Sequence, residues 1–286
     1  MYIPEKCGLI PFPLPPVSDR IKIKNSNNSL FLRPFGLCEK DLDVDFAQKV
    51  RPQLITQILE CCTIDKDGKP LDQSFFLDLT MSKRIECLLN IVNSGNSSDM
   101  PIYLRCLNKA CQQMMETEVS MEEFTHVQQK EDKDYCDIRL GSETLSIRRP
   151  TGGDQLEWLR YDFTDKDRAV KTMIRTLIRN EEKTLINQER NIPDEWVRII
   201  DEVMKEFDPL VNCVLSVQCP YCGKEDQYEV DLEEILLRRL HKVQLQLLET
   251  VHRLAKHYHW SEHQIFSVPP WRRSYYISLI EKEEDR

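Results

Sequence analysis

The chain has little glycine and no long apolar run, and both deficits exclude classes of protein. Only 8 of its 286 residues are glycine. Neither GxGxxG nor GxxxxGK[ST] occurs, which argues against a glycine-rich phosphate-binding loop. No apolar stretch approaches the roughly 18–20 residues that span a bilayer. The first twenty residues are too rich in proline for the apolar helical core of a signal peptide. We therefore expect a cytosolic protein that does not bind membranes.

An excess of basic charge and a recognisable catalytic constellation are also absent. The formal net charge of -9 disfavours nucleic-acid binding as the default function. Four of the six histidines lie late in the chain, at His252, His257, His259 and His263, without HExxH spacing, which is typical of a solvated polar face. No GxSxG nucleophile elbow occurs. The sequence predicts a protein that is not an enzyme, and an enzyme whose site leaves no motif is the alternative.

Cysteine, by contrast, is abundant. The chain has 11 cysteines, an odd number without a visible secretion signal, so a disulfide framework explains them poorly. Seven of them show no ligand spacing and are interpreted as small buried hydrophobic residues or reduced thiols. These seven are Cys7, Cys38, Cys61, Cys62, Cys87, Cys136 and Cys213.

Two segments repeat one pattern around the remaining cysteines. CLNKAC (106–111) and CPYC (219–222) are each followed by a short polar and apolar alternation that ends in Glu-Val. A helix-starting capping box then follows at 120–123 and at 231–234. Gly223, directly after CPYC, permits the backbone conformation that such a turn needs. The repeat predicts two equivalent hairpins, each with a cysteine knuckle at its tip.

The two knuckles together predict a metal site. Four thiolates in a tetrahedral arrangement suit zinc and leave no open position for chemistry. We therefore expect one structural zinc held by Cys106, Cys111, Cys219 and Cys222, in a zinc ribbon whose halves are separated by residues 112–218. The alternative is a relic of the repeat that binds no metal.

Helical periodicity dominates the rest of the chain. Apolar residues recur at helical spacing over 39–63, where Pro52 predicts a kink or two shorter helices. Similar stripes occur over 81–93 and 165–189, and a helix is expected to begin near Leu156. The longest stripe predicts a helix of about 27 residues from Leu232 to Tyr258, which packs in the core or against a partner.

These features predict a mainly helical α+β fold with a small two-knuckle zinc-ribbon β unit and a long amphipathic C-terminal helix. The expected parts are a proline-rich flexible arm (1–35), a helical region (36–100), a split ribbon (101–235) and a C-terminal helical region (231–286). The ribbon halves are 101–126 and 211–235, and they enclose an inserted hairpin and helices at 127–210.

The most distinctive string is HWSEHQIFSVPPWRRSYYISLI at 259–280. Ser261 and Gln264 form a capping box for a short helix, Pro269 and its neighbour turn the chain, and a last helix follows from Trp271. This region either closes the core or forms a recognition end for a partner protein, because tryptophan, tyrosine and arginine dominate protein interfaces.

The segment 237–280 resembles the C-terminal region of the T-even-phage-type baseplate hub assembly chaperone family. Its hallmarks are a long helix, then W-S-E-x-x-I, a proline turn and R-R-x-x-Y. The string RRPTGGDQLEWL at 148–159 is similar to members that carry cysteine pairs in the same order. The resemblance covers roughly 100–280. The matching positions are Trp260, Ser261, Glu262, Ile265, Pro269, Arg272, Arg273 and Tyr276.

The resemblance implies a non-enzymatic assembly factor or structural component for the baseplate hub of a phage tail or contractile injection system. It would act in the bacterial cytoplasm and bind hub, spike or tail-tube-initiation proteins, and its retention in the particle is left open. The expected partner-binding residues are Trp260, Ile265, Pro269, Trp271, Arg272, Arg273 and Tyr276.

A zinc-ribbon nucleic-acid-binding regulatory protein is the alternative function. The strings RRLHK (238–242) and PPWRRSYY (269–276) could contact phosphates or stack on bases. Residues 231–286, however, contain equal numbers of acidic and basic residues, so this region has no basic footprint.

Overall fold

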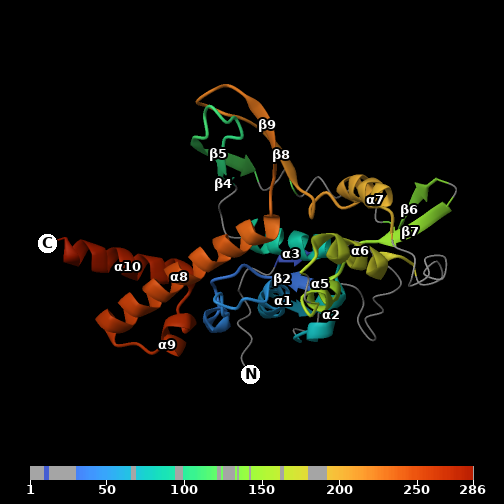
Figure 1. Ribbon diagram of the computed structural model, residues 1–286. Coiled ribbons are helices and arrows are strands. Elements are labelled where there is room, and N and C mark those ends of the chain that lie inside the picture. Colours follow the sequence, from blue (N-terminus) through green and yellow to red (C-terminus); the bar gives the residue numbers. More distant parts are fainter. Residues whose placement is uncertain are drawn as a thin grey trace.

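The computed structural model describes most of the chain and shows a mixed α+β fold. Within the described residues helices predominate and the strands form only small antiparallel sheets (Figure 1). The predicted α+β class is therefore confirmed. The described residues are 10–12, 30–65, 69–93, 99–120, 124, 133, 135–141, 143–161, 164–179 and 192–285.

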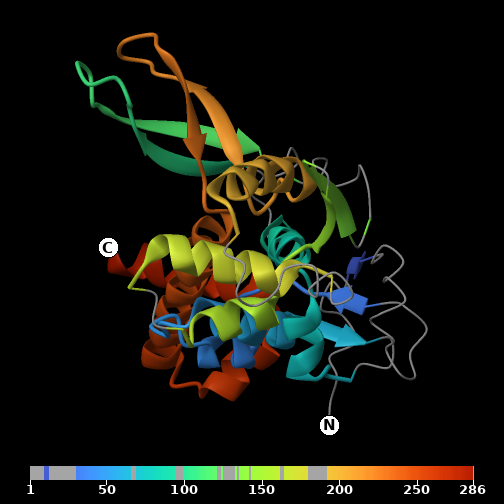
Figure 2. The same cartoon turned by 45° about the vertical axis from the view of Figure 1, so that its right-hand side comes forward.

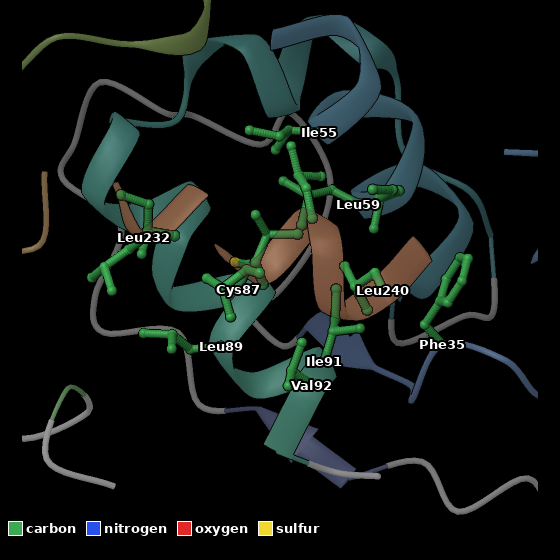
Figure 3. Packing of buried hydrophobic residues seen from close by; sticks show 14 of the residues in the cluster. Phe35, Ile55, Leu59, Cys87, Leu89, Ile91, Val92, Leu232 and Leu240 are labelled. Carbon is green, nitrogen blue, oxygen red and sulfur yellow. The ribbon is translucent and has the colours of Figure 1, made fainter. Parts of the chain in front are cut away.

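The main hydrophobic core lies between helices α1 (Arg51–Cys62), α3 (Met81–Asn93) and the first half of α8 (Leu232–Tyr258). Figure 3 shows Ile55 and Leu59 packed with Cys87, Leu89 and Leu240 in this cluster. Each helix buries one apolar stripe, as its 3.6-residue periodicity predicts. The core thus joins residues from both ends of the chain, so α8 holds the N-terminal helices together.

The stripe over 39–63 forms two elements, so the break at Pro52 is a helix start and not a kink. A short 3-10 helix, η1, covers Glu39–Asp43, and α1 begins at Arg51. Pro52 occupies the first turn of α1, where its missing N–H costs no helical hydrogen bond. Buried Asp41 fixes the preceding segment, because it accepts two hydrogen bonds from the Arg33 guanidinium at 2.8 and 2.5 Å.

A three-stranded antiparallel sheet lies beside this core. Its order is β1 (Ile10–Phe12), β2 (Leu30–Leu32) and β3 (Thr63–Asp65). The strands β1 and β2 belong to the segment predicted as a flexible arm, 1–35, and most other residues of that segment lie outside the described part. Residues 30–32 of β2 pair with β3 in an antiparallel register.

The inserted segment has a hydrophobic cluster of its own. Strands β6 (Tyr135–Leu140) and β7 (Glu143–Arg148) form the predicted hairpin, with Gly141 at a positive φ of 65° in its turn. Apolar residues of this hairpin pack against α6 (Lys166–Leu177) and α7 (Asp194–Phe207). Figure 2 shows α7 next to the hairpin.

Two helix boundaries in the insertion differ from the prediction. Helix α5 covers Gly152–Trp158 and begins before Leu156, because the Thr151 side chain caps it. The helix expected over 165–189 ends at Leu177, since Ile178 adopts extended backbone and pairs with Ile147 of β7. Leu185, which was part of the predicted stripe, lies outside the described residues.

The insertion is anchored to the main core through α5. The Met81 N–H donates to Pro150 O at 2.8 Å, and the Gly152 N–H donates to Leu79 O at 3.2 Å. Gly152 also lies against the buried guanidinium of Arg84, where a Cβ would come within 2.4 Å of Nη1. This close approach explains why the position requires glycine.

The long helix α8 has the predicted bounds and extends well beyond the core (Figure 1). At its far end, α9 (Glu262–Ser267) and α10 (Pro270–Glu284) pack against it around buried apolar residues. The capping box of Ser261 and Gln264 is present at the start of α9, as predicted. None of the helices in the described part of the chain has the length and apolarity to cross a membrane.

Candidate metal centre

The cysteine pairs lie at the tips of two antiparallel hairpins. Strands β4 (Asp99–Arg105) and β5 (Met114–Ser120) form the first, and β8 (Val214–Gln218) and β9 (Glu225–Glu229) form the second. The last paired residues before each tip are Arg105 with Met114 and Gln218 with Glu225. Both views show the hairpins side by side and projecting from the helical body (Figures 1 and 2).

The facing sides of the hairpins enclose a small core. Cys106, Met115, Cys219 and Tyr228 are buried in it, and neighbouring side chains on the outer faces are exposed. This follows from the two-residue period of a strand, which places alternate side chains on opposite faces. The Leu107 N–H of the first hairpin donates a hydrogen bond to the Tyr228 hydroxyl of the second at 3.3 Å.

The two knuckles share one backbone path although their cysteine spacings differ. The Cys106 N–H donates to Gln113 O at 3.0 Å, and the Cys219 N–H donates to Lys224 O at 2.9 Å. In both cases the acceptor lies two residues after the second cysteine. The intervening residue has positive φ, which is 50° at Gln112 and 70° at Gly223. The sequence repeat therefore corresponds to a structural repeat.

The four sulfur atoms converge on one point. The ligand atoms of Cys106, Cys111, Cys219 and Cys222 all lie within 4.8 Å of one another. Two of the separations are 3.7 Å, between Cys106 and Cys222, and 3.9 Å, between Cys111 and Cys219. A disulfide requires about 2.05 Å. Tetrahedral zinc with bonds of about 2.3 Å places its sulfurs about 3.8 Å apart. The cluster could therefore bind a metal ion.

The thiols of this cluster have different tendencies to ionise. The Lys224 backbone N–H donates to Cys222 and lowers the pKa of that thiol to about 7. The Asn108 side-chain amide also donates to Cys222, at 3.7 Å. Burial raises the pKa of Cys106 to about 12. A bound cation would favour the thiolate form of all four residues, because metal ligation requires deprotonated sulfur.

Of the two helix-capping boxes predicted after the knuckles, one can be compared with the structure. Asp231 caps α8, because its carboxylate accepts a hydrogen bond from the Glu234 N–H at 3.0 Å. The box predicted at 120–123 lies outside the described residues, apart from the backbone of Ser120 in β5. Of the seven cysteines without ligand spacing, Cys7 also lies outside the described residues, and the other six are buried or partly buried.

Two of the predicted partner-binding residues are buried within the chain. Ile265 is fully buried between α8, α9 and α10. Arg273 is also buried, with its guanidinium 5.0 Å from the centre of the Phe266 ring. Both residues therefore hold the C-terminal helices together.

The other predicted contact residues lie at or near the surface. Trp260 and Tyr276 are partly buried, and each packs against Tyr258. Pro269, Trp271 and Arg272 are exposed, with 71% of Trp271 accessible. The sequence pattern did not separate the packing side of this segment from its outer side. Tyr275, which it did not name, is 56% exposed.

Comparison of the chain with protein-family models, curated proteins and solved structures finds no match.

Proposed function

We propose that Cys106, Cys111, Cys219 and Cys222 hold one structural zinc ion and that the two hairpins form a split zinc ribbon. The convergence of the four sulfur atoms within 4.8 Å supports this proposal. Four thiolates are a typical structural zinc set, and they leave no position for a substrate or an activated water. The ion would cross-link two hairpins whose shared core is small.

We further propose that the protein is a non-enzymatic assembly factor or structural component of a baseplate hub, in a phage tail or a contractile injection system. The resemblance of residues 237–280 to hub assembly chaperones motivates this function. The observation that carries it is the exposed Trp271, with Arg272 beside it, on helices whose inner side is fixed by buried Ile265 and Arg273. A rigidly presented tryptophan and arginine pair is typical of an interface hot spot.

Affinity capture of the tagged protein from its native host, followed by mass spectrometry, tests the assembly function. Hub, spike or tube-initiation proteins should be captured with about one zinc per chain by elemental analysis. The double variant Trp271→Ala/Arg272→Ala should lose these proteins and keep the zinc. Leu159→Ala/Arg160→Ala, which alters an exposed pair on the insertion, is the matched control. Capture of hub proteins by the Trp271 variant at the parental level would contradict the proposed surface.

Nucleic-acid binding by the hairpins is the second candidate function. Tyr103 and Tyr221 are each 64% exposed on the outer surface of the hairpins, and Arg105, Lys109 and Lys224 are close to them in sequence. Exposed aromatic rings beside basic residues can stack on unpaired bases. Fluorescence anisotropy with single-stranded DNA and RNA over a series of salt concentrations tests this candidate. Binding that falls steeply with salt and is weakened by Tyr221→Ala would favour it over the assembly function.

A further inference from the structure

A cleft of about 480 Å³ lies where the base of the second hairpin meets the helical body. Its walls come from β8 and β9, from α7 and α5 of the insertion, and from α1, α3 and α8 of the core. The volume is within the roughly 300–1,000 Å³ of small-ligand sites. The cleft is separate from the cysteine cluster and from the exposed end of α10. Its charged residues are Arg51, Asp201, Lys205, Glu229, Asp231 and Glu233.

The charges of this cleft do not balance. Two cations and four carboxylates line it, which leaves a net charge of about -2 when all are ionised. Arg51 pairs with Asp231 at 2.5 Å, and Lys205 pairs with Asp201 at 2.9 Å. Each cation thus has a close carboxylate, and Arg51 also lies 4.0 Å from Glu233. The two remaining carboxylates come from the end of β9 and from the first turn of α8.

The carboxylate from α8, Glu233, is the central group. Its side chain is only 5% exposed. Its Oε2 receives a long hydrogen bond of 3.5 Å from the Gln155 amide and lies 4.0 Å from Arg51 Nη1. Its Oε1 is buried without a hydrogen-bond partner among the described residues, and so is Gln155 Oε1. Two buried acceptors that lack donors carry a desolvation cost, which a ligand with N–H groups would remove.

The electrostatic environment of Glu233 is consistent with an unsatisfied Oε1 atom. Burial raises the pKa of this carboxyl group, and nearby Arg84 and Arg51 oppose the shift without cancelling it. Arg84 directs its hydrogen bonds elsewhere, to the carbonyl oxygens of Pro52 and Phe76 at 2.6 and 2.7 Å. The carboxylate therefore has cations in its surroundings, but the described part of the chain supplies no N–H donor to its Oε1.

We propose that this cleft binds an organic cation with several N–H donors, and that a guanidinium group fits it best. Glu233 Oε1 and Gln155 Oε1 would accept its hydrogen bonds, and Glu229 at the rim would add attraction. A guanidinium presents five N–H groups in a planar fork and can serve two acceptors at once, whereas an ammonium is a compact point charge. This site is independent of the proposed zinc and of the proposed hub partners.

The group could belong to a small molecule or to an arginine side chain of a partner protein. Either ligand would contact the hairpin base, the insertion and α8 together, because all three contribute to the walls. Agmatine represents the free molecule, and N-acetyl-arginine amide represents an arginine in a peptide. N-acetyl-citrulline amide has nearly the same shape without the charge.

Isothermal titration calorimetry of the full chain, purified with its metal, tests the proposal with these three probes. Agmatine or the capped arginine should bind, and the citrulline probe should bind at least about tenfold more weakly, because the buried carboxylate requires a charged donor. Stronger binding of the capped arginine indicates a protein side chain as the natural ligand. Binding of agmatine alone indicates a small molecule.

Variants locate the binding to the cleft. Glu233→Gln should weaken binding of the guanidinium probe at least about tenfold. Glu249→Gln, on the exposed surface of the same helix, should leave it unchanged. Glu229→Gln changes an exposed residue and provides a second test if Glu233→Gln does not fold. Absence of binding by both guanidinium probes, or equal binding of the citrulline probe, would overturn the proposal.

Discussion

Single residues decide how the two knuckles turn. Gln112 and Gly223 occupy the same place after the second cysteine, and both have positive φ. Glycine adopts this conformation freely, whereas a residue with a Cβ is strained there. Gly223 was recognised from the sequence, since glycine after CxxC is informative. Gln112 was not, because nothing about a glutamine predicts a left-handed backbone.

Substitutions at Gly223 and Gln112 should change the free energy of unfolding in opposite directions. We expect Gly223→Ala to lower the free energy of unfolding by about 1–2 kcal/mol through backbone strain. Apart from its two chain neighbours, no described residue has an atom within 4 Å of the added Cβ, so a clash would not contribute. Gln112→Gly should raise it by up to about 1 kcal/mol. Urea denaturation of the metal-loaded protein measures both values. Gly153→Ala in α5 is the control, where alanine should be tolerated; an equal loss there would contradict the explanation.

Asp208, at the end of α7, is a buried acid between the insertion and the core. Only 1% of it is exposed, and Arg149 Nε is 4.0 Å from its Oδ1. Desolvation raises its pKa from 3.8 to about 6, and Ser82 and Arg149 offset only part of this effect. The native state therefore holds this proton more tightly than the unfolded chain. The charged form costs stability above about pH 6, and the cost decreases as the pH falls toward 4.

Replacement of this acid by its neutral isostere should stabilise the protein in a pH-dependent way. We expect Asp208→Asn to raise the free energy of unfolding at pH 8 by up to about 3 kcal/mol. At pH 5 the difference in free energy of unfolding between variant and parent should be roughly half as large. Urea denaturation of both proteins at the two pH values measures this difference, so any effect of pH on metal binding cancels. Asp285→Asn, on the exposed end of α10, controls for the loss of one negative charge. A difference in the free energy of unfolding that increases toward low pH would contradict the raised pKa of Asp208.

At the scale of elements, the C-terminal helices have a packing side and an outer side. Ile265 is 0% exposed and packs with Val251, Leu254 and Ile280, whereas Trp271 projects outward. Arg253 of α8 also pairs with Glu281 of α10 at 2.9 Å, although such exposed pairs contribute little. Apolar burial therefore sets the position of α9 and α10.

Substitutions on these two sides should separate stability from binding. We expect Ile265→Ala to cost about 2–5 kcal/mol in the C-terminal unit, because it leaves a cavity. Trp271→Ala should change stability by less than about 0.5 kcal/mol. Hydrogen–deuterium exchange of α9 and α10 measures both effects. A strong loss of protection in the Trp271 variant would show that this residue also serves packing, and its role in partner capture would then need another explanation.

At the scale of the whole molecule, four hydrophobic clusters divide the described residues. They are the helical core, the insertion, the space between the hairpins, and the far end of α8. The cluster between the hairpins and the cluster at the far end of α8 each have four buried residues, but fewer partly buried residues pack against the former. The cluster between the hairpins includes two of the four cysteines of the proposed zinc site, so a bound metal and this cluster would depend on each other.

Removal of the proposed metal should therefore affect the hairpins first. We expect a strong chelator to abolish exchange protection in β4, β5, β8 and β9, while α1, α3 and the first half of α8 stay protected by their own core. Hydrogen–deuterium exchange with and without the chelator measures this. Cys219→Ser should reproduce the effect, and Cys213→Ser, at a thiol outside the cluster, is the control. Uniform loss of protection would instead show that the metal supports the entire fold.

Local periodicity and helix capping made part of this fold predictable from the residues alone. The bounds of α8, the β6–β7 hairpin, the capping box of α9 and the membership of the cysteine cluster all follow from residue spacing within short windows. Even the pairing of the distant knuckles was predictable, because the pattern around the cysteines is repeated.

Which side of each helix or strand is covered depends on contacts between elements, and the residue pattern did not predict it. Ile265, Arg273 and Asp208 are buried. The helix expected over 165–189 ends at Leu177, because Ile178 pairs with β7. The cleft around Glu233 is formed by residues from seven elements, including Arg51, Gln155 and Asp201. Such features depend on contacts between positions far apart in the chain, and no local periodicity encodes them.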